Sequence, residues 1–328
     1  MEKNDNSWDS MYLDPKKFPY IKSIDRDLVP AIPLPPPTGQ SFAFFIDMDY
    51  GKKNNRILVI PDIHGRTFWL EKKDDVDKYS KVIFLGDYLD PYLDEDITVE
   101  DAIENFKEII EFKKNNMDKV ILLLGNHDMP YYSEEYFNNG SHFSRWSLFH
   151  HKEIEELFRT NKDLFTLVYI QDDIIFSHAG FRYSWLDYYV NKVVKTEDGK
   201  PFVDITDINS FLNINKLLDM EEVWLLGIMS DIRAMRFARS DGSCIWADIE
   251  EYEYKDKLFD YKQVFGHTCQ YDLIQIDEET WKSRFTDPVV HDNIMMLDNG
   301  IYHEIDPENF KLINYANTRR IINDETNT

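Results

Sequence analysis

Three short runs of β-branched and other apolar residues dominate the first half of the sequence: RILVIP (56–61), KVIFLG (81–86) and KVILLLG (119–125). Each run is apolar without alternation, which is typical of strands covered on both faces. The segments between them are 66–80 and 98–116, and the second carries an amphipathic stripe that predicts a helix. Thr98 and Asp101 resemble a capping box at its start. This strand–helix–strand order indicates a parallel α/β sheet.

The second half of the chain predicts more strands but fewer helices between them. FTLVYI and DIIFSH, separated by QDD within 165–178, predict a hairpin. Later strand-like runs are QVFGH (263–267), YDLIQI (271–276), NIMMLD (293–298) and IYHEID (301–306). The sequence DNG (298–300) predicts a turn between the last two runs. The charged, aromatic stretch 183–260, with helices expected near 207–222 and 222–238, indicates an insertion or cap.

The length of the chain, 328 residues, predicts one elaborated domain. Residues 1–50 are expected to form an N-terminal extension, because AIPLPPPTGQ (31–40) is too rich in proline for a helix or a central strand. The domain itself is predicted over 51–310, with the insertion at about 183–260. Residues 311–328 are predicted to be a C-terminal tail.

The composition argues against two classes of partner and favours one compartment. The chain has 61 acidic and 37 basic residues, and its formal net charge of −24 opposes binding to nucleic acid or to an anionic membrane. No apolar run reaches the roughly 18 residues that cross a membrane, and the polar N-terminal segment does not resemble a signal peptide. Two cysteines, Cys244 and Cys269, are too few for a disulfide framework and favour a reduced, cytoplasmic location.

Polar residues that bind metals follow each of the predicted strands. They are Asp62 and His64; Asp87 and Asp90; Asn126, His127 and Asp128; His178; and His267. Because ligands bind outside the carboxyl ends of strands in open α/β sheets, these side chains are expected to converge. Carboxylate, imidazole and amide donors without thiolate suit Mn, Fe, Zn or Mg. Taken alone, Asp62 or Asp87 is equally well explained as a cap of the following helix.

The ordered motifs PDIHG, GDYLDPY, GNHD, SHAGF and FGHT resemble those of the calcineurin-like metallophosphoesterases. The spacing is most similar to the phosphoprotein-phosphatase branch, which includes bacterial and phage members and the symmetrical dinucleoside tetraphosphatases. The resemblance covers roughly 56–306 and extends to MMLDNGIYH near its end. It implies a four-layer α/β/β/α sandwich with two central mixed β-sheets.

The resemblance also implies a site with two divalent or trivalent metal ions, with Mn, Fe or Zn as candidates. Asp62 and His64 would hold the first ion, Asp87 would bridge both, and the second would be completed by Asn126, His178 and His267. A water that bridges the metals would attack phosphorus directly. His127 would protonate the leaving group, and Asp90 would orient this histidine.

Two positions depart from the pattern of the family. Pro91 stands where relatives carry a phosphate-binding arginine, and Asp128 replaces the commoner glutamate. The phosphate must then be neutralised by the metals or by another arginine. Arg145 and Arg182 are the preferred candidates because they lie close in sequence to site strands; Arg233, Arg236 and Arg239 are the others.

The sequence therefore predicts a metal-dependent phosphoester hydrolase, whose substrate is a small phosphomonoester or a nucleotide. A Ser/Thr-type phosphoprotein phosphatase is the alternative within the class, and the missing arginine and the negative charge argue against it. A metal-binding scaffold without activity is a second alternative, although every presumed ligand and His127 are present. A nuclease is opposed by the charge of −24 and by the lack of a basic stripe.

Overall fold

The computed structural model describes residues 55–134, 136, 145–194, 196, 199–219, 242–248, 261–269, 271–275, 281–285, 287–291 and 293–313. All of them belong to the unit Gly51–Thr328. The predicted N-terminal extension, the helix predicted near 222–238, and Arg233, Arg236 and Arg239 lie outside the described residues.

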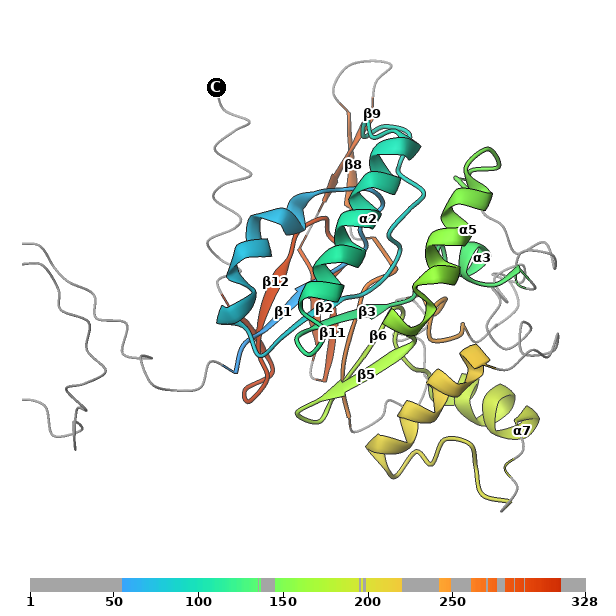
Figure 1. The fold of residues 1–328 in the computed structure, drawn as a ribbon. Coiled ribbons are helices and arrows are strands. Elements are labelled where there is room, and N and C mark those ends of the chain that lie inside the picture. Colours follow the sequence, from blue (N-terminus) through green and yellow to red (C-terminus); the bar gives the residue numbers. More distant parts are fainter. Residues whose placement is uncertain are drawn as a thin grey trace, which may run out of the picture. The chain divides into compact units, whose positions relative to one another are not determined.

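Six strands form the first sheet in the order β13–β12–β1–β2–β3–β4. Strands β12, β1, β2 and β3 of this sheet are labelled in Figure 1. Their bounds are β1 (Ile57–Ile60), β2 (Lys81–Phe84), β3 (Val120–Leu123), β4 (Phe165–Thr166), β12 (His303–Asp306) and β13 (Lys311–Ile313). Strands β1 to β4 are parallel, as the sequence predicts, and β12 makes the sheet mixed because it pairs antiparallel with both β1 and β13. Strand β13 follows residue 310, so the sheet continues into the predicted tail.

Five strands form the second sheet in the order β10–β11–β7–β6–β5. They are β5 (Val168–Gln171), β6 (Ile174–Ser177), β7 (Lys262–Phe265), β10 (Val289–His291) and β11 (Ile294–Met296). The predicted hairpin is present as the antiparallel pair β5–β6, although Phe165–Thr166 pairs with the first sheet instead. A separate two-stranded sheet contains β8 (Tyr271–Gln275) and β9 (Trp281–Phe285).

The turn predicted at 298–300 joins the two sheets rather than two paired strands. Strand β11 before it pairs with β7 and β10, whereas β12 after it pairs with β1 and β13. Gly300 has a φ of 77°, a left-handed conformation that favours glycine. The turn signal is therefore real, but the chain crosses from the second sheet to the first.

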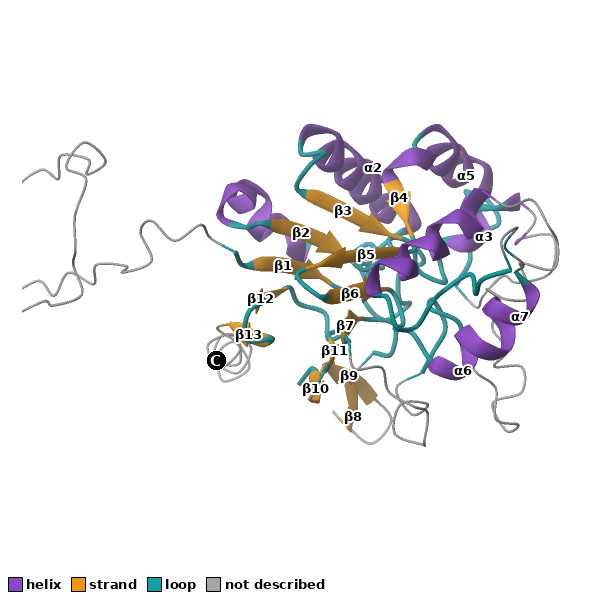
Figure 2. Cartoon of the chain, turned by 90° about the horizontal axis from the view of Figure 1, so that it is seen from below, coloured by secondary structure: helices purple, strands orange, loops and turns teal. Residues whose placement is uncertain are grey.

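Helices cover the outer face of the first sheet, and further short helices lie in the insertion that follows β6 (Figure 2). The main ones are the 3₁₀ helix η2 (Phe68–Lys78), α2 (Val99–Asn115), α3 (Met129–Tyr132) and α5 (His151–Thr160). The described part of the insertion contains α6 (Tyr183–Trp185), the π-helix η4 (Leu186–Val190), α7 (Asn191–Val193) and the 3₁₀ helix η5 (Ile208–Asp219). Among these helices, none has both the length and the apolar character needed to cross a bilayer.

Alternate residues of the central strands face two different cores. Val59 of β1 and Phe176 of β6 belong to the cluster between the two sheets. Leu58 of β1 packs instead in the cluster that contains Phe106 of α2. Helix η5 packs against β5. The layers therefore run helix, sheet, sheet, helix, and the four-layer α/β/β/α sandwich with two mixed sheets is confirmed.

The predicted capping box fixes the start of α2. The Thr98 side chain accepts from the Asp101 backbone N–H at 3.0 Å, and the Asp101 carboxylate accepts from the Thr98 N–H at 3.3 Å. These two bonds satisfy N–H groups that the first turn of a helix leaves without an internal partner. The helix that covers β1 to β3 thus begins where the sequence places its start.

Candidate metal centre

The carboxyl ends of strands from both sheets bring the predicted ligands to one place. Asp62 and His64 follow β1, Asp87 follows β2 and Asn126 follows β3, while His178 and His267 follow β6 and β7 of the second sheet. The first five of these residues are at most 2% exposed, and His267 is half-buried. The site therefore lies at the common edge of the two sheets, as the sequence predicts.

Sharp bends after the strands turn the predicted site side chains toward each other. His64, Asp87, Asp90 and His267 have φ values of 45°, 52°, 58° and 70°, in the left-handed region. Such a conformation costs a non-glycine residue about 1 kcal/mol. Backbone bonds hold the first bend, because the Ile63 and His64 N–H groups donate to the Asp87 carbonyl at 3.1 and 2.7 Å. Local strain is thus accepted where the side chains must converge.

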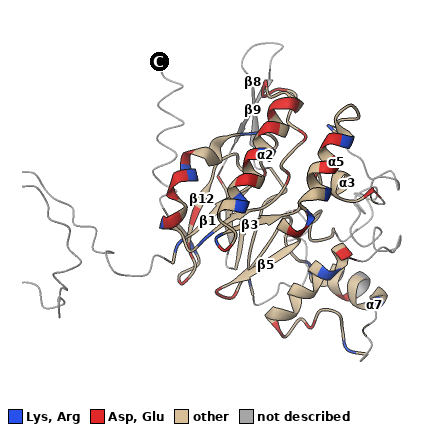
Figure 3. Cartoon of the chain, in the orientation of Figure 1, with Lys and Arg blue, Asp and Glu red and all other residues tan. Residues whose placement is uncertain are grey.

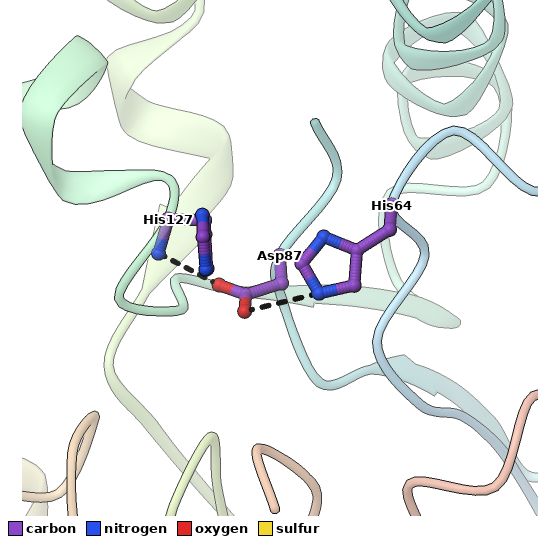
Figure 4. A group of neighbouring side chains, drawn as sticks. All are labelled: His64, Asp87 and His127. Atoms are coloured by element: carbon purple, nitrogen blue, oxygen red, sulfur yellow. Dashed lines mark hydrogen bonds and ion pairs between the residues drawn. The ribbon is translucent and has the colours of Figure 1, made fainter. Parts of the chain in front are cut away.

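The Asp87 carboxylate lies between imidazoles that come from different sheets. Its Oδ2 is 3.6 Å from Nε2 of His64 and 3.6 Å from Nε2 of His178. Its Oδ1 accepts the backbone N–H of His127 at 2.9 Å (Figure 4). Donor atoms within 4.8 Å of one another form two groups: His64, Asp87 and His127; and Asp87, His178 and His267. Asp87 belongs to both groups.

The tautomers of two histidines aim lone pairs at this carboxylate. His64 Nδ1 lies 2.9 Å from the Leu89 carbonyl, and His178 Nδ1 lies 2.9 Å from the Leu85 carbonyl. A carbonyl only accepts, so Nδ1 carries the proton, and Nε2 of the neutral ring is a bare acceptor. Burial, followed by the nearby His127 and Arg145, holds the pKa of His64 well below its usual value. Acceptors that face a carboxylate oxygen fit a site built for cations.

The second group of donors is tighter. Asn126 Oδ1 lies 2.9 Å from His178 Nε2 and 2.9 Å from His267 Nδ1, and these two ring nitrogens are 3.2 Å apart. An amide oxygen and two imidazole nitrogens form a borderline-hard donor set. The set contains the residues that the sequence predicts for the second ion.

Asp62 also has a backbone partner at the junction of the two sheets. Its carboxylate oxygens accept the His267 backbone N–H at 3.1 and 3.2 Å, which ties the end of β1 to the end of β7. Asp62 belongs to neither group of donor atoms within 4.8 Å of one another, and its part in holding the first ion stays a prediction. A Cβ at Gly266 would come within 2.2 Å of Asp62 Oδ1, so only glycine leaves room for this carboxylate.

Buried negative charge gathers around the site. Burial, with a contribution from Asp62, raises the pKa of Asp87 to about 7. Burial and Asp62 also raise the pKa of Asp298, from the turn before β12, well above its ordinary value. Carboxylates crowded out of water favour protonation unless positive charge compensates them. The electrostatics thus agree with the donor geometry: the residues fit metal cations.

Next to the metal groups, a histidine and a carboxylate form a close pair. His127 Nδ1 lies 2.9 Å from Asp90 Oδ2, and Asp90 is 3% exposed. Asp90 Oδ1 accepts the hydroxyl of Tyr131 at 2.7 Å. The predicted partnership of His127 and Asp90 is therefore present in the geometry.

Arg145 reaches the same place from a distant segment. Its Nε donates to the Asp90 carbonyl at 2.9 Å, and one terminal nitrogen lies 3.4 Å from His127 Nε2 and 3.5 Å from the ring nitrogens of His64. The guanidinium also stacks on Tyr92. Arg182, the other favoured candidate, lies at the start of α6 with 8% exposure, and its role in the site stays a prediction.

The sequence predicts Asp128 as one of the polar residues that converge at the strand ends but assigns it to neither metal ion. Its carboxylate accepts three backbone N–H groups: Asp87 at 2.8 Å, Tyr88 at 3.0 Å and Gly125 at 2.8 Å. These bonds join the loops that follow β2 and β3. Tyr92 and Tyr131 were missed, because their partners are distant in sequence and an isolated tyrosine carries no motif.

Comparison with known proteins gives one family and a distant structural likeness. The family model of the calcineurin-like phosphoesterases matches residues 55–271. No curated protein sequence matches the chain. Among solved structures, a protein serine/threonine phosphatase from Saccharomyces cerevisiae matches with 19% identity and a TM-score of 0.27. That match covers 40% of each chain, so this chain spans less than half the length of that relative.

Proposed function

The chain belongs to the calcineurin-like phosphoesterase family, and from this premise we propose that it hydrolyses phosphoesters with a pair of metal ions. One observation carries the proposal: a single oxygen of Asp87 lies 3.6 Å from imidazole nitrogens of both His64 and His178. A carboxylate shared by two donor groups is the arrangement that two neighbouring cations require.

The proposed metal ligands are the six residues at the strand ends. Asp62, His64 and Asp87 would hold the first ion, and Asp87, Asn126, His178 and His267 the second. Mn, Fe or Zn suits these oxygen and imidazole donors. When bound, such a pair supplies Lewis-acid activation of the phosphoryl group and lowers the pKa of water.

The remaining site residues have roles that follow from their positions. We assign His127 to protonate the leaving oxygen, because its Nε2 faces the site while Nδ1 is held by Asp90. Arg145 is assigned to the phosphate, since its guanidinium lies within 3.5 Å of both His64 and His127. It would supply the charge that Pro91 does not.

The proposed substrate is a small phosphomonoester or a nucleotide. The net charge of −24 opposes a bulky acidic partner and nucleic acid, and acidic side chains lie along α2 (Figure 3). Because Arg145 lies at the site, the missing arginine at position 91 no longer argues against a phosphoprotein substrate. Only the negative net charge of the chain still argues against this alternative. We keep the predicted bounds of the N-terminal extension and of the insertion as part of the proposal, with the domain extended to include β13. We also keep the cytoplasmic location, which is based on the two free cysteines.

A substrate panel tests the proposal. Protein loaded with Mn would be assayed on phosphomonoesters, phosphodiesters, dinucleoside polyphosphates and a phosphoserine peptide, with and without chelator. We expect the small monoesters or nucleotides to be hydrolysed best. Chelator or Asp87→Asn should abolish turnover, and His127→Asn should lower the turnover of alkyl esters by about 10²–10⁴. Asp118→Asn, at an exposed position, is the control. Wild-type rates in Asp87→Asn or His127→Asn would show that the roles are wrong, and fastest turnover of the peptide would favour the phosphoprotein alternative.

A further inference from the structure

Each oxygen of Asp90 has a partner from a different part of the site. Oδ2 faces His127 Nδ1 at 2.9 Å, Oδ1 accepts from the Tyr131 hydroxyl at 2.7 Å, and the backbone carbonyl accepts from Arg145 Nε at 2.9 Å. Asp90 therefore joins the proton-donating histidine to the arginine assigned to phosphate. Tyr131 is the member of this network that no motif predicts.

The direction of the bonds at the Tyr131 hydroxyl is fixed. The Ser147 backbone N–H donates to it at 2.9 Å, so the oxygen accepts there and its own hydrogen is directed to Asp90. Tyr131 is fully buried, and Ser147 lies two positions after Arg145. One hydroxyl thus connects the Asp90 carboxylate to the segment that carries Arg145.

We propose that Tyr131 is a positioning residue, which orients Asp90 and thereby His127 for proton transfer and also holds the Arg145 segment against the site. A carboxylate has a broad, nearly two-fold torsion about its last bond, so a single partner does not fix it. The Tyr131 bond to one oxygen leaves the other oxygen aimed at His127. This inference depends on the proposed hydrolase function.

The role predicts a specific kinetic signature. In the hydrolysis, the oxygen of water bonds to phosphorus as the P–O bond to the alcohol breaks, the departing oxygen takes a proton from His127, and a proton of the water returns the histidine to its starting state. An alkyl alcohol needs that proton, whereas dinitrophenolate leaves without it. Loss of orientation must therefore slow alkyl phosphates more than dinitrophenyl phosphate.

The test compares Tyr131→Phe with a matched control, Tyr79→Phe. Tyr79 is also buried and donates to a carboxylate, Glu304 at 2.8 Å, but it precedes β2, at the opposite end of the strand from Asp87. In the Mn-loaded protein, kcat of Tyr131→Phe is expected to fall about tenfold or more for alkyl phosphates, as part of the roughly 10²–10⁴ that acid catalysis supplies. The kcat for dinitrophenyl phosphate should change less than about twofold. KM for both substrates should rise and inhibition by inorganic phosphate should weaken, because the segment that carries Arg145 is held less firmly. Tyr79→Phe should affect all substrates equally.

Two further measurements separate orientation from simple damage. 4-Aminophenylalanine at position 131 keeps an N–H donor near Asp90 and should restore most of the rate on alkyl phosphates. In a His127→Asn background, Tyr131→Phe should cause no further loss of kcat on these substrates, because its effect on proton transfer acts through the histidine. An equal loss of kcat on both leaving groups, or an additive loss of kcat with His127→Asn, overturns the proposal. A wild-type protein that hydrolyses no ester would instead overturn the proposed function itself.

Discussion

The guanidinium carbon of Arg145 lies 3.8 Å from the centre of the Tyr92 ring. Tyr92 directly follows Pro91, the position at which relatives are expected to carry their phosphate-binding arginine. The ring therefore holds, beside the same loop, a positive charge that arrives from another segment. A contact of this kind contributes about 0.5–2 kcal/mol.

Replacement of Arg145 is expected to weaken phosphate binding. Arg145→Ala should raise KM for a phosphomonoester about tenfold or more, because a charge-assisted contact of about 1.5–3 kcal/mol is lost. Arg145→Lys should recover only part of it, since lysine cannot reproduce the planar contacts with Asp90 and Tyr92. Steady-state kinetics and phosphate inhibition measure the effect. Arg159→Ala, an exposed arginine paired with Glu156, is the control. An unchanged KM in Arg145→Ala would remove Arg145 from the site.

Metal affinity should rise with pH up to about pH 7. Burial raises the pKa of Asp87 to about 7, so below that pH a proton competes with the metal for this carboxylate. Above it the carboxylate is already ionised, and the gain should level off. Calorimetric titration of Mn in buffers of different ionisation enthalpy counts the protons released. We expect close to one proton near pH 6 and a smaller number near pH 8. Equal release at both values would contradict the assignment.

Removal of metal should lower stability. Lone pairs of His64 and His178 face the Asp87 carboxylate, and cations relieve this repulsion. At a metal concentration 100 times Kd, binding adds about 2.7 kcal/mol, which corresponds to a rise in Tm of roughly 5–10 °C. Thermal unfolding with Mn and with chelator measures the difference. In Asp87→Asn the gain should be much smaller, and an equal gain there would place the stabilising ion elsewhere.

Asp128→Asn should destabilise the protein although it touches no presumed substrate. An amide has one acceptor oxygen, so its NH₂ group would confront at least one of the N–H groups that now donate to the carboxylate. A buried donor left without a partner costs about 1–3 kcal/mol. Chemical unfolding measures the loss, and the exposed Asp118→Asn is the comparison. Metal affinity should also fall, because the Asp87 loop loosens. A stability equal to that of wild type would show that the backbone bonds carry little energy.

The sequence predicted those site residues that directly follow an apolar strand. The ends of β1, β2 and β3 were predicted because apolar runs stop at Asp62, Asp87 and Asn126, and the parallel order brings these ends together. The sequence did not predict which connections carry the chain from one sheet to the other. DNG has the same local turn chemistry whether it closes a hairpin or, as here, carries the chain from β11 to β12 of the other sheet.

Side chains that act across long sequence separations were also out of reach. Arg145 was one of several candidate arginines, and only the fold shows that it meets Asp90, His64 and His127. The Tyr131 hydroxyl gave no signal, since its partners Asp90 and Ser147 lie on separate segments. Such pairings depend on tertiary packing, which local patterns do not encode.

The left-handed backbone at His64, Asp87, Asp90 and His267 has an evolutionary consequence. At these positions glycine or asparagine would relieve the backbone strain. Substitutions that stabilise the fold would therefore remove the proposed site residues. Descendants that no longer need the reaction should therefore replace these four residues first and keep the rest of the sandwich unchanged. A silent descendant of this protein would be recognised by glycines at the strand ends and an otherwise unaltered core.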